Sequence, residues 1–235
     1  MSFRNRTTGK MCTDVSPADI GDRFVADEQE STEIQTPTPC DTSPLAAPAS
    51  QASMQELTVA CQLLLTQLGL PLQDENFRET PSRLAKALVG FCTGYEPVEQ
   101  ALTDFAYSNE ANSMVALKDI TVSALCPHHL FPWLGVVAIG YIPHKRVLGL
   151  SKLPRLVYAA SHVMPMMQEE FTDLVADLIS TRMEPRGVIV RVAAKHTCMA
   201  CRGVEQPQTL TVTQAIRGVY RDVPAARTEF ADLVR

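Results

Sequence analysis

The chain has 235 residues, a net charge of −5 and 46% hydrophobic residues, which is enough for one globular domain of ordinary size and an appendage. Most of the net negative charge falls in residues 1–53, so the remainder is nearly neutral and has no excess of basic residues that would indicate nucleic-acid binding. The longest apolar stretch, 130–143, is too short to span a bilayer. With no secretory signal and seven cysteines that are not spaced like a disulfide scaffold, we expect a cytoplasmic protein with reduced thiols and neither nucleic acid nor membrane as a partner.

Residues 1–53 are the most polar part of the chain and are expected to form a disordered N-terminal tail. Thr, Ser, Pro, Asp and Glu dominate this stretch, and TPTPCDTSPLAAPASQAS has no apolar period. Such a tail can serve regulation or targeting, or it can be a plain solvated extension, which the composition favours. A single folded domain is expected over residues 54–235.

Two helices are predicted at the start of this domain. The first begins near Met54 and ends at Gly69. Its apolar residues recur at three- and four-residue steps: Leu57, Cys61, Leu64, Leu65 and Leu68. The second begins with Thr80 as its cap and Pro81 in its first turn. Its buried stripe is expected to comprise Leu84, Ala87, Leu88 and Phe91.

The rest of the domain alternates a pair of strands with a pair of helices. Strands are predicted over 116–126 and 133–143. Helices follow over 152–162, with Ser151 as cap, and over 166–183. Two more strands are predicted over 188–194 and 209–219. Strands grouped in adjacent pairs favour an α+β fold, in which helices lie on one face of an antiparallel sheet.

Two short clusters of cysteine and histidine stand about 70 residues apart, Cys126-Pro127-His128-His129 and His196-Thr197-Cys198. On an extended segment His196 and Cys198 would point to the same face. Cys126 and His129 need a turn to converge, and Pro127 favours one. Thiolate and imidazole suit zinc. Together the clusters can supply three zinc ligands and leave a position open, as in a catalytic site.

Other interpretations of the same residues stay open. Cys198 and Cys201 could join the first cluster in a closed structural site of three cysteines and one histidine, although the two thiols face opposite ways on an extended segment. A disulfide joining Cys198 to Cys201 or to Cys126 is a further state, disfavoured in a reducing compartment. Buried cysteines and surface histidines without any metal are the simplest alternative.

A second group of residues is cationic. Lys152 and Arg155 lie one turn apart near the start of a predicted helix, where free N–H groups are available. The other members are Arg202, Arg83 and Lys86. If they converge, these cations suit a polyphosphate; separately, each is an ordinary solvated charge. Gln168 and Glu169 begin the long helix, where a carboxylate either accepts the N–H groups of a guanine edge or simply complements the helix dipole.

The motifs together resemble those of GTP cyclohydrolase I over residues 54–235. The matching stretches are ETPSRLAKAL, CPHH, GYIP, GLSKLPRLV, QEEFTDL, PRGVIV, HTCMACRGV, TVTQAIRGVYR and RTEFADLVR. The resemblance implies a tunnelling fold assembled as a homodecamer. It also implies conversion of GTP and water to 7,8-dihydroneopterin triphosphate and formate, the first step of pterin biosynthesis for folate or tetrahydrobiopterin.

The resemblance also assigns roles by position. Cys126, His129 and Cys198 look like ligands of Zn²⁺, whose bound water would attack C8 of the guanine ring. His128 looks like the proton donor to that ring, and His196 like an acid or base near the ribose. Glu169, with Gln168, looks like the guanine-recognition element. The triphosphate site would comprise Ser151, Lys152, Arg155 and Arg202, with Arg83 and Lys86 contributed across a subunit boundary.

Two residues depart from the family's pattern. Pro127 stands where the family usually has Glu, which removes a carboxylate and an N–H beside the metal. Cys201 is an additional thiol. Because of Pro127, an enzyme of the same fold that acts on another purine, or that stops after ring opening, remains an alternative. The second departure leaves open a non-catalytic subunit of a cyclohydrolase assembly, with Cys201 closing the metal site.

Overall fold

The computed structural model describes residues 51–94, 96–101, 104–106 and 113–235. The predicted tail lies outside this part, except for its last three residues, which already belong to the first helix. None of the helices in these described ranges has the length and apolar character that crossing a membrane requires.

The first two helices are α2 (Gln51–Gln67) and α3 (Thr80–Gly90), which pack against each other. Their buried residues include Cys61 and Leu65 on α2 and Ala85 on α3. The predicted stripes are wider than this contact, and Leu64, Leu68 and Ala87 are exposed. Thr80 is the first helical residue rather than the cap; Glu79 holds that position without a side-chain hydrogen bond.

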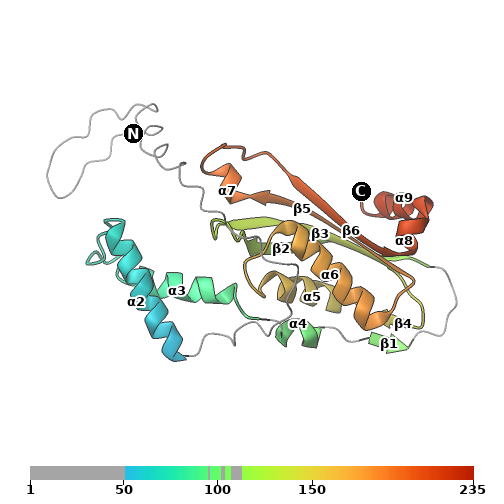
Figure 1. The fold of residues 1–235 in the computed structure, drawn as a ribbon, viewed down its shortest axis with the longest axis horizontal. Coiled ribbons are helices and arrows are strands. Elements are labelled where there is room, and N and C mark those ends of the chain that lie inside the picture. Colours follow the sequence, from blue (N-terminus) through green and yellow to red (C-terminus); the bar gives the residue numbers. More distant parts are fainter. Residues whose placement is uncertain (1–50, 95, 102–103, 107–112) are drawn as a thin grey trace, which may run out of the picture. The chain divides into compact units, whose positions relative to one another are not determined.

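Four long strands form an antiparallel sheet in the order β2-β3-β5-β6 (Figure 1). Their bounds lie close to the predicted ones: β2 Val115–Leu125, β3 Pro132–Ile142, β5 Gly187–His196 and β6 Thr211–Gly218. Alternation along β3 buries Val137, Ile139 and Tyr141 on one face, as period-2 geometry requires. The sequence patterns did not reveal β1 (Asp104–Ala106) and β4 (Arg146–Leu148), which pair in a separate two-stranded sheet.

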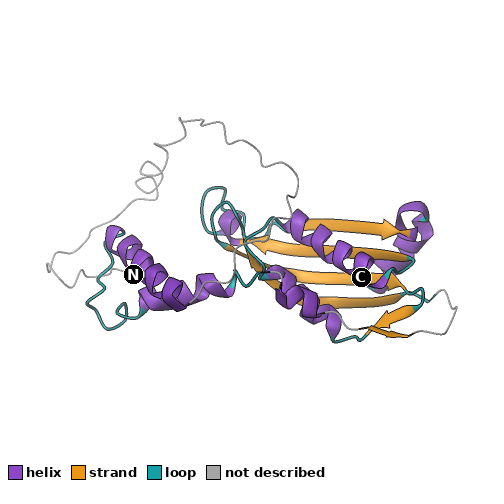
Figure 2. Ribbon diagram, turned by 60° about the horizontal axis from the view of Figure 1, so that its bottom comes forward, coloured by secondary structure: helices purple, strands orange, loops and turns teal. Residues whose placement is uncertain are grey.

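Helices α5 (Lys152–Ser161) and α6 (Gln168–Met183) cover one face of the sheet (Figures 1 and 2). α5 packs on β2, α6 packs on β5 and β6, and the short helix α4 (Glu96–Ala101) packs on α5. Phe171, Val175 and Ile179 recur every four residues along α6 and are fully buried. Ser151 occupies the cap position of α5, but its side chain makes no cap hydrogen bond. The predicted α+β arrangement is confirmed.

Two helices at the C-terminal end were not predicted, α8 (Val219–Asp222) and α9 (Pro224–Leu233). They form a second hydrophobic cluster, in which Tyr220 and Phe230 pack with Ile189. Ile189 points away from the face that α5 and α6 cover, because its neighbours Val188 and Val190 belong to the main core. A Cβ at Gly140 would lie 2.5 Å from the Phe230 ring, so the close approach of α9 requires glycine there.

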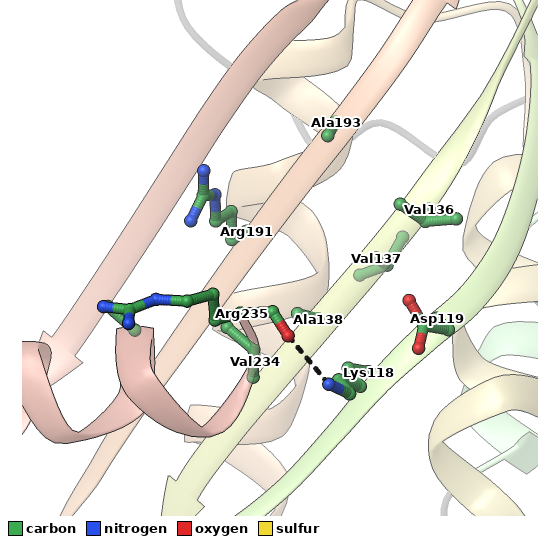
Figure 3. Close-up of a pocket in the computed structure, with 10 residues that line it drawn as sticks. Lys118, Asp119, Val136, Val137, Ala138, Arg191, Ala193, Val234 and Arg235 are labelled. Carbon is green, nitrogen blue, oxygen red and sulfur yellow. Dashed lines mark hydrogen bonds between the residues drawn. The ribbon is translucent and has the colours of Figure 1, made fainter.

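The same sheet face carries an open hollow of about 420 Å³ between β2, β3, β5 and the end of α9 (Figure 3). One wall is a β-bulge in β2, where the register shifts between Leu117 and Ile120 and Asp119 has a φ of 61°. The Nζ atom of Lys118 in this bulge donates to the backbone oxygen of Arg235 at 2.9 Å. None of the candidate site residues lines this hollow.

Candidate active site

The two cysteine–histidine clusters leave the sheet at the same end. Leu125, at the end of β2, pairs with Pro132, and Trp133 on β3 pairs with His196 at the end of β5. The residues that follow β2 and β5 therefore flank the start of β3. A hydrogen bond from the Thr197 hydroxyl to the backbone oxygen of Pro132, 2.6 Å long, ties the two segments together. Sheet register thus explains why clusters 70 residues apart in the chain meet.

Cys126, His129 and Cys198 form a possible metal site. Their ligand atoms, two thiol sulfurs and one ring nitrogen, all lie within 4.8 Å of one another. In a tetrahedral zinc site with bonds of about 2.0–2.3 Å, ligand atoms are roughly 3.3–3.8 Å apart. A small inward movement of these side chains would therefore close them on an ion. The donor set and its spacing fit zinc.

The local backbone places each ligand. After buried Cys126 the chain turns, with the Leu130 N–H donating to the Cys126 carbonyl and the Cys126 N–H to that of Phe131, each at 2.9 Å. This turn between Cys126 and His129 was predicted. The extended geometry predicted for Cys198 is wrong, because the residue lies in the short helix α7 (Thr197–Ala200).

Cys201 is not part of this cluster. Its exposed thiol donates to the Thr197 carbonyl at 2.8 Å, back toward α7. The closed site of three cysteines and one histidine is therefore not formed. The five cysteines of the described ranges are free thiols, so neither disulfide alternative is formed.

The two thiols of the cluster also favour a cation electrostatically. Burial raises the pKa of the Cys198 thiol above its usual value, and the nearby Cys126 raises it further, while the charge of Arg202 lowers it. Two neighbouring thiolates repel each other, and a divalent cation between them removes that cost. The arrangement therefore suits metal ligation better than it suits a pair of free thiolates.

His196 is held by Gln168, whose side chain is 1% exposed. The Gln168 nitrogen lies 3.1–3.2 Å from three acceptors, the carbonyls of Val192 and Thr211 and the hydroxyl of Thr213. This surrounding fixes the orientation of the amide, so its oxygen faces His196 Nε2 at 2.9 Å and accepts from it. Nε2 of His196 therefore carries a hydrogen, and Nδ1 is the nitrogen left for other chemistry.

Two further features define the histidines of the site. The Trp133 ring stacks on His196 with centroids 5.9 Å apart. Burial lowers the pKa of His196, and the charge of Glu169 opposes this shift. His128 is exposed, and its Nδ1 lies 3.6 Å from the Cys126 sulfur. The motifs did not reveal Trp133 or Thr213 as partners of the site. In the sequence, only the alternation of side chains along β3 and β6 indicates which face of the sheet these two residues lie on.

Within the described ranges, none of the predicted cations makes a hydrogen bond or ion pair with a ligand of the metal cluster. Lys152 and Arg155 lie at the start of α5, after Ser151, while Arg83 and Lys86 are exposed on α3. Arg202 and Glu169 are exposed. The charge of Arg202 acts on the Cys198 thiol, and the charge of Glu169 acts on His196. Within the described ranges, hydrogen bonds and ion pairs are absent from the side chains of Arg83, Lys86, Lys152, Arg155 and Arg202.

Comparison with known proteins places these residues in a family. The sequence profile described as GTP cyclohydrolase I matches residues 57–235. GTP cyclohydrolase 1 of Homo sapiens is 39% identical over 187 residues, which cover 79% of this chain and 74% of the human protein. GTP cyclohydrolase 1 of Methylococcus capsulatus is 37% identical over 172 residues, covering 73% of this chain and 92% of that protein.

The profile spans every strand of the four-stranded sheet and all three residues of the metal cluster. The antiparallel sheet with α5 and α6 on one face is the tunnelling fold that the sequence resemblance implied. The chain belongs to the GTP cyclohydrolase I family.

Proposed function

We propose that this protein is a zinc-dependent GTP cyclohydrolase I, which converts GTP and water to 7,8-dihydroneopterin triphosphate and formate at the start of pterin biosynthesis. The observation that carries the proposal is the meeting of Cys126, His129 and Cys198 at the sheet end where His196 also lies, in a chain of this family. Cys201 points elsewhere, so the three ligands keep a position open.

The metal would be held by the two thiolates and the His129 imidazole. A zinc ion bound there would lower the pKa of a water at its open position toward neutrality and so supply a nucleophile for C8 of guanine. Pro127 lies exposed in the turn between two of these ligands, and its substitution for Glu removes none of the three.

The two remaining histidines are suited to proton transfer. His128 is exposed beside Cys126, where it can donate a proton to the purine ring. His196 uses Nε2–H to bind Gln168, so Nδ1 is its proton-accepting atom near the ribose. Burial lowers the pKa of His196, which favours the neutral base near pH 7. Gln168 would then act by orienting His196, because its own amide is fully engaged inside the fold.

Substrate recognition is assigned to the exposed charges. Glu169 can accept the paired N–H groups of a guanine edge, since its carboxylate is exposed next to the buried Gln168. Ser151, Lys152, Arg155 and Arg202 are assigned to the triphosphate, and their side chains are free of ion pairs within the described ranges.

Arg83 and Lys86 are assigned to the triphosphate site of a neighbouring subunit in a homodecamer. Both are exposed on α3, whose principal packing partner is α2. The sheet has two edge strands, β2 and β6, whose outer backbone groups can pair with another chain. A cytoplasmic location stays a prediction from the sequence; a reducing compartment would maintain the five free thiols of the described part.

GTP turnover tests the proposal. Purified protein should release formate from GTP and form a fluorescent pterin, with one zinc per chain, and Cys198→Ala should lose both zinc and turnover. Full turnover by protein without bound zinc would contradict the mechanism. Accumulation of a formylamino intermediate without pterin would instead indicate an enzyme that stops after ring opening.

A further inference from the structure

His162 lies at the joint between the end of α3 and the end of α5. Its ring stacks on Phe91, with centroids 4.9 Å apart and an interplanar angle of 6°, and on Tyr158, at 4.3 Å and 28°. Two rings cannot both stack on one face of an imidazole without contacting each other, so Phe91 and Tyr158 cover opposite faces. The imidazole is therefore a clamp between the two helix ends, and only 9% of the residue is exposed.

Backbone hydrogen bonds close the same joint. The N–H and the hydroxyl of Thr93 both donate to the carbonyl of His162, at 2.7 and 2.8 Å. The N–H of Gly94 donates to the carbonyl of Val163 at 3.1 Å. Gly94 has a φ of 78°, which turns the chain into this contact at little steric cost. The segment that follows α3 is thus bound to the residues that end α5.

The tautomer of His162 follows from its partners. Nδ1 lies 2.8 Å from the Tyr158 carbonyl, which can only accept, so Nδ1 carries a hydrogen. The Ser161 hydroxyl donates to that same carbonyl at 2.8 Å and lies 2.9 Å from Nδ1. The Tyr158 carbonyl is among the last four of α5, which lack helical partners. His162 therefore satisfies the helix end while it holds the ring against Phe91.

This joint controls where α3 lies. Within the described ranges, α3 packs chiefly against α2, and the hydrogen bonds that follow it go to His162 and Val163. Arg83 is eight residues before Phe91, about 12 Å along a helix. A rotation of about 10° at the joint would move its Cα by roughly 2 Å. A displacement of that size takes a cation out of hydrogen-bond distance of a phosphate oxygen and so weakens binding.

We propose that His162 is a positioning residue for triphosphate binding. It fixes the cations of α3, Arg83 and Lys86, relative to the rest of their own subunit, from which they would extend into the triphosphate site of the neighbouring subunit. The inference rests on the proposed function, because it takes these cations to bind the triphosphate. His162 acts without contacting the substrate: its ring stacks on Phe91, and its carbonyl accepts from Thr93.

The first test compares His162→Ala with His162→Phe in the full chain. Loss of the ring should raise KM for GTP about tenfold with kcat nearly unchanged, because binding geometry is disturbed and the reacting groups are not. Phe keeps the stacked ring and should restore most of the affinity. Equal KM values for wild type and His162→Ala, in protein of unchanged assembly state, would overturn the proposal.

The second test places His162→Ala in two backgrounds. With Arg83→Ala and Lys86→Ala already present, the His162 substitution should raise KM no further, whereas with Lys152→Ala its effect should add fully. A purely structural role would weaken GTP binding equally in both backgrounds, which would contradict the proposal.

Hydrogen exchange separates this inference from the proposed function. In His162→Ala the amides of α3 should exchange faster, while those of α6 at Phe171 to Ile179 stay protected. Unchanged exchange in α3 would refute the clamp even in an active enzyme. If the wild type turns over no GTP, the proposed function fails, and the clamp is tested by this exchange together with the binding of inorganic tripolyphosphate.

Discussion

Gln168 and His196 share a hydrogen bond of 2.9 Å that joins the start of α6 to the end of β5. Three acceptors hold the Gln168 nitrogen, so its oxygen is directed at His196 and fixes a hydrogen on Nε2. The Thr172 hydroxyl lies 2.6 Å from that of Thr213 and extends the network. A buried amide with all of its hydrogen-bonding groups engaged is a rigid support for an imidazole that must present one particular nitrogen.

Removal of the Gln168 amide should lower both the folding stability and the turnover. In Gln168→Leu, Nε2 of His196 loses its acceptor and two carbonyls lose a donor, so we expect a stability loss of about 1–3 kcal/mol. Turnover should fall about 100-fold, since a general acid or base contributes 10²–10⁴-fold when it is correctly placed. Denaturant unfolding and kcat for GTP measure the two effects.

Thr213→Val is the matched control. It removes one of the three acceptors around the Gln168 nitrogen and leaves the bond to His196 in place. Its stability cost should be about 1 kcal/mol, with turnover within a few-fold of the wild type. If Gln168→Leu folds and retains wild-type kcat, the support of His196 by Gln168 has no role in catalysis.

The metal site should distinguish two cysteines only three residues apart. Cys198→Ala removes a ligand and should abolish stoichiometric zinc binding along with turnover. Cys201→Ala should retain both, because its thiol bonds to the Thr197 carbonyl outside the cluster. Mass spectrometry measures the zinc content of both variants. Loss of zinc from Cys201→Ala would mean that Cys201 is a fourth ligand, which closes the site.

The four long strands and the helices α5 and α6 could be predicted because their side chains repeat with a clear period. Val188, Val190 and Val192 are buried on one face as alternation requires, and Phe171, Val175 and Ile179 mark α6. The C-terminal helices escaped prediction because their apolar residues are few and widely spaced. Tyr220 and Phe230 find their cluster only through Gly140 and Ile189, which lie far away in the sequence.

The metal ligands could be predicted from residue type and spacing, but the reason for their convergence could not. The sequence suggested an extended Cys198, whereas strand register and the Thr197 hydrogen bond bring a short helix to the cluster. The family resemblance implied that Gln168 contacts the guanine together with Glu169. Burial separates them: Gln168 is 1% exposed, whereas Glu169 faces solvent.

Guanine recognition should depend on Glu169 and not on its neighbour. Glu169→Ala removes an exposed carboxylate and should lower kcat/KM for GTP about 10²–10³-fold with little change in stability. The enzyme's preference for GTP over ITP, which lacks the exocyclic amino group, should also largely disappear.

Glu170→Ala provides the contrast on the next residue. The Glu170 carboxylate accepts from the Met167 N–H at 3.0 Å and caps α6. Its loss should cost about 1 kcal/mol of stability, and the preference for GTP over ITP should stay intact. If Glu169→Ala discriminates between the two nucleotides as the wild type does, another residue reads the guanine edge.

Tyr220 should destabilise the fold at high pH. The residue is fully buried, and its hydroxyl has no hydrogen-bond partner within the described ranges. Burial raises its pKa, and the charge of Glu229 raises it further. The unfolded chain therefore ionises first, at a pKa of about 10, so folding stability is complete below that pH and declines as the pH rises above it. Tyr220→Phe should lose this part of the alkaline decline.

At pH 7 the same substitution should be neutral or stabilising by up to about 1 kcal/mol, because it removes a buried hydroxyl without a partner. Urea unfolding at pH 7 and pH 10.5 measures both effects. Tyr158→Phe is the control, since that residue is 66% exposed and the substitution removes a hydroxyl without changing a buried site. A loss of more than 1 kcal/mol for Tyr220→Phe at pH 7 would mean that the hydroxyl is satisfied in the assembled protein.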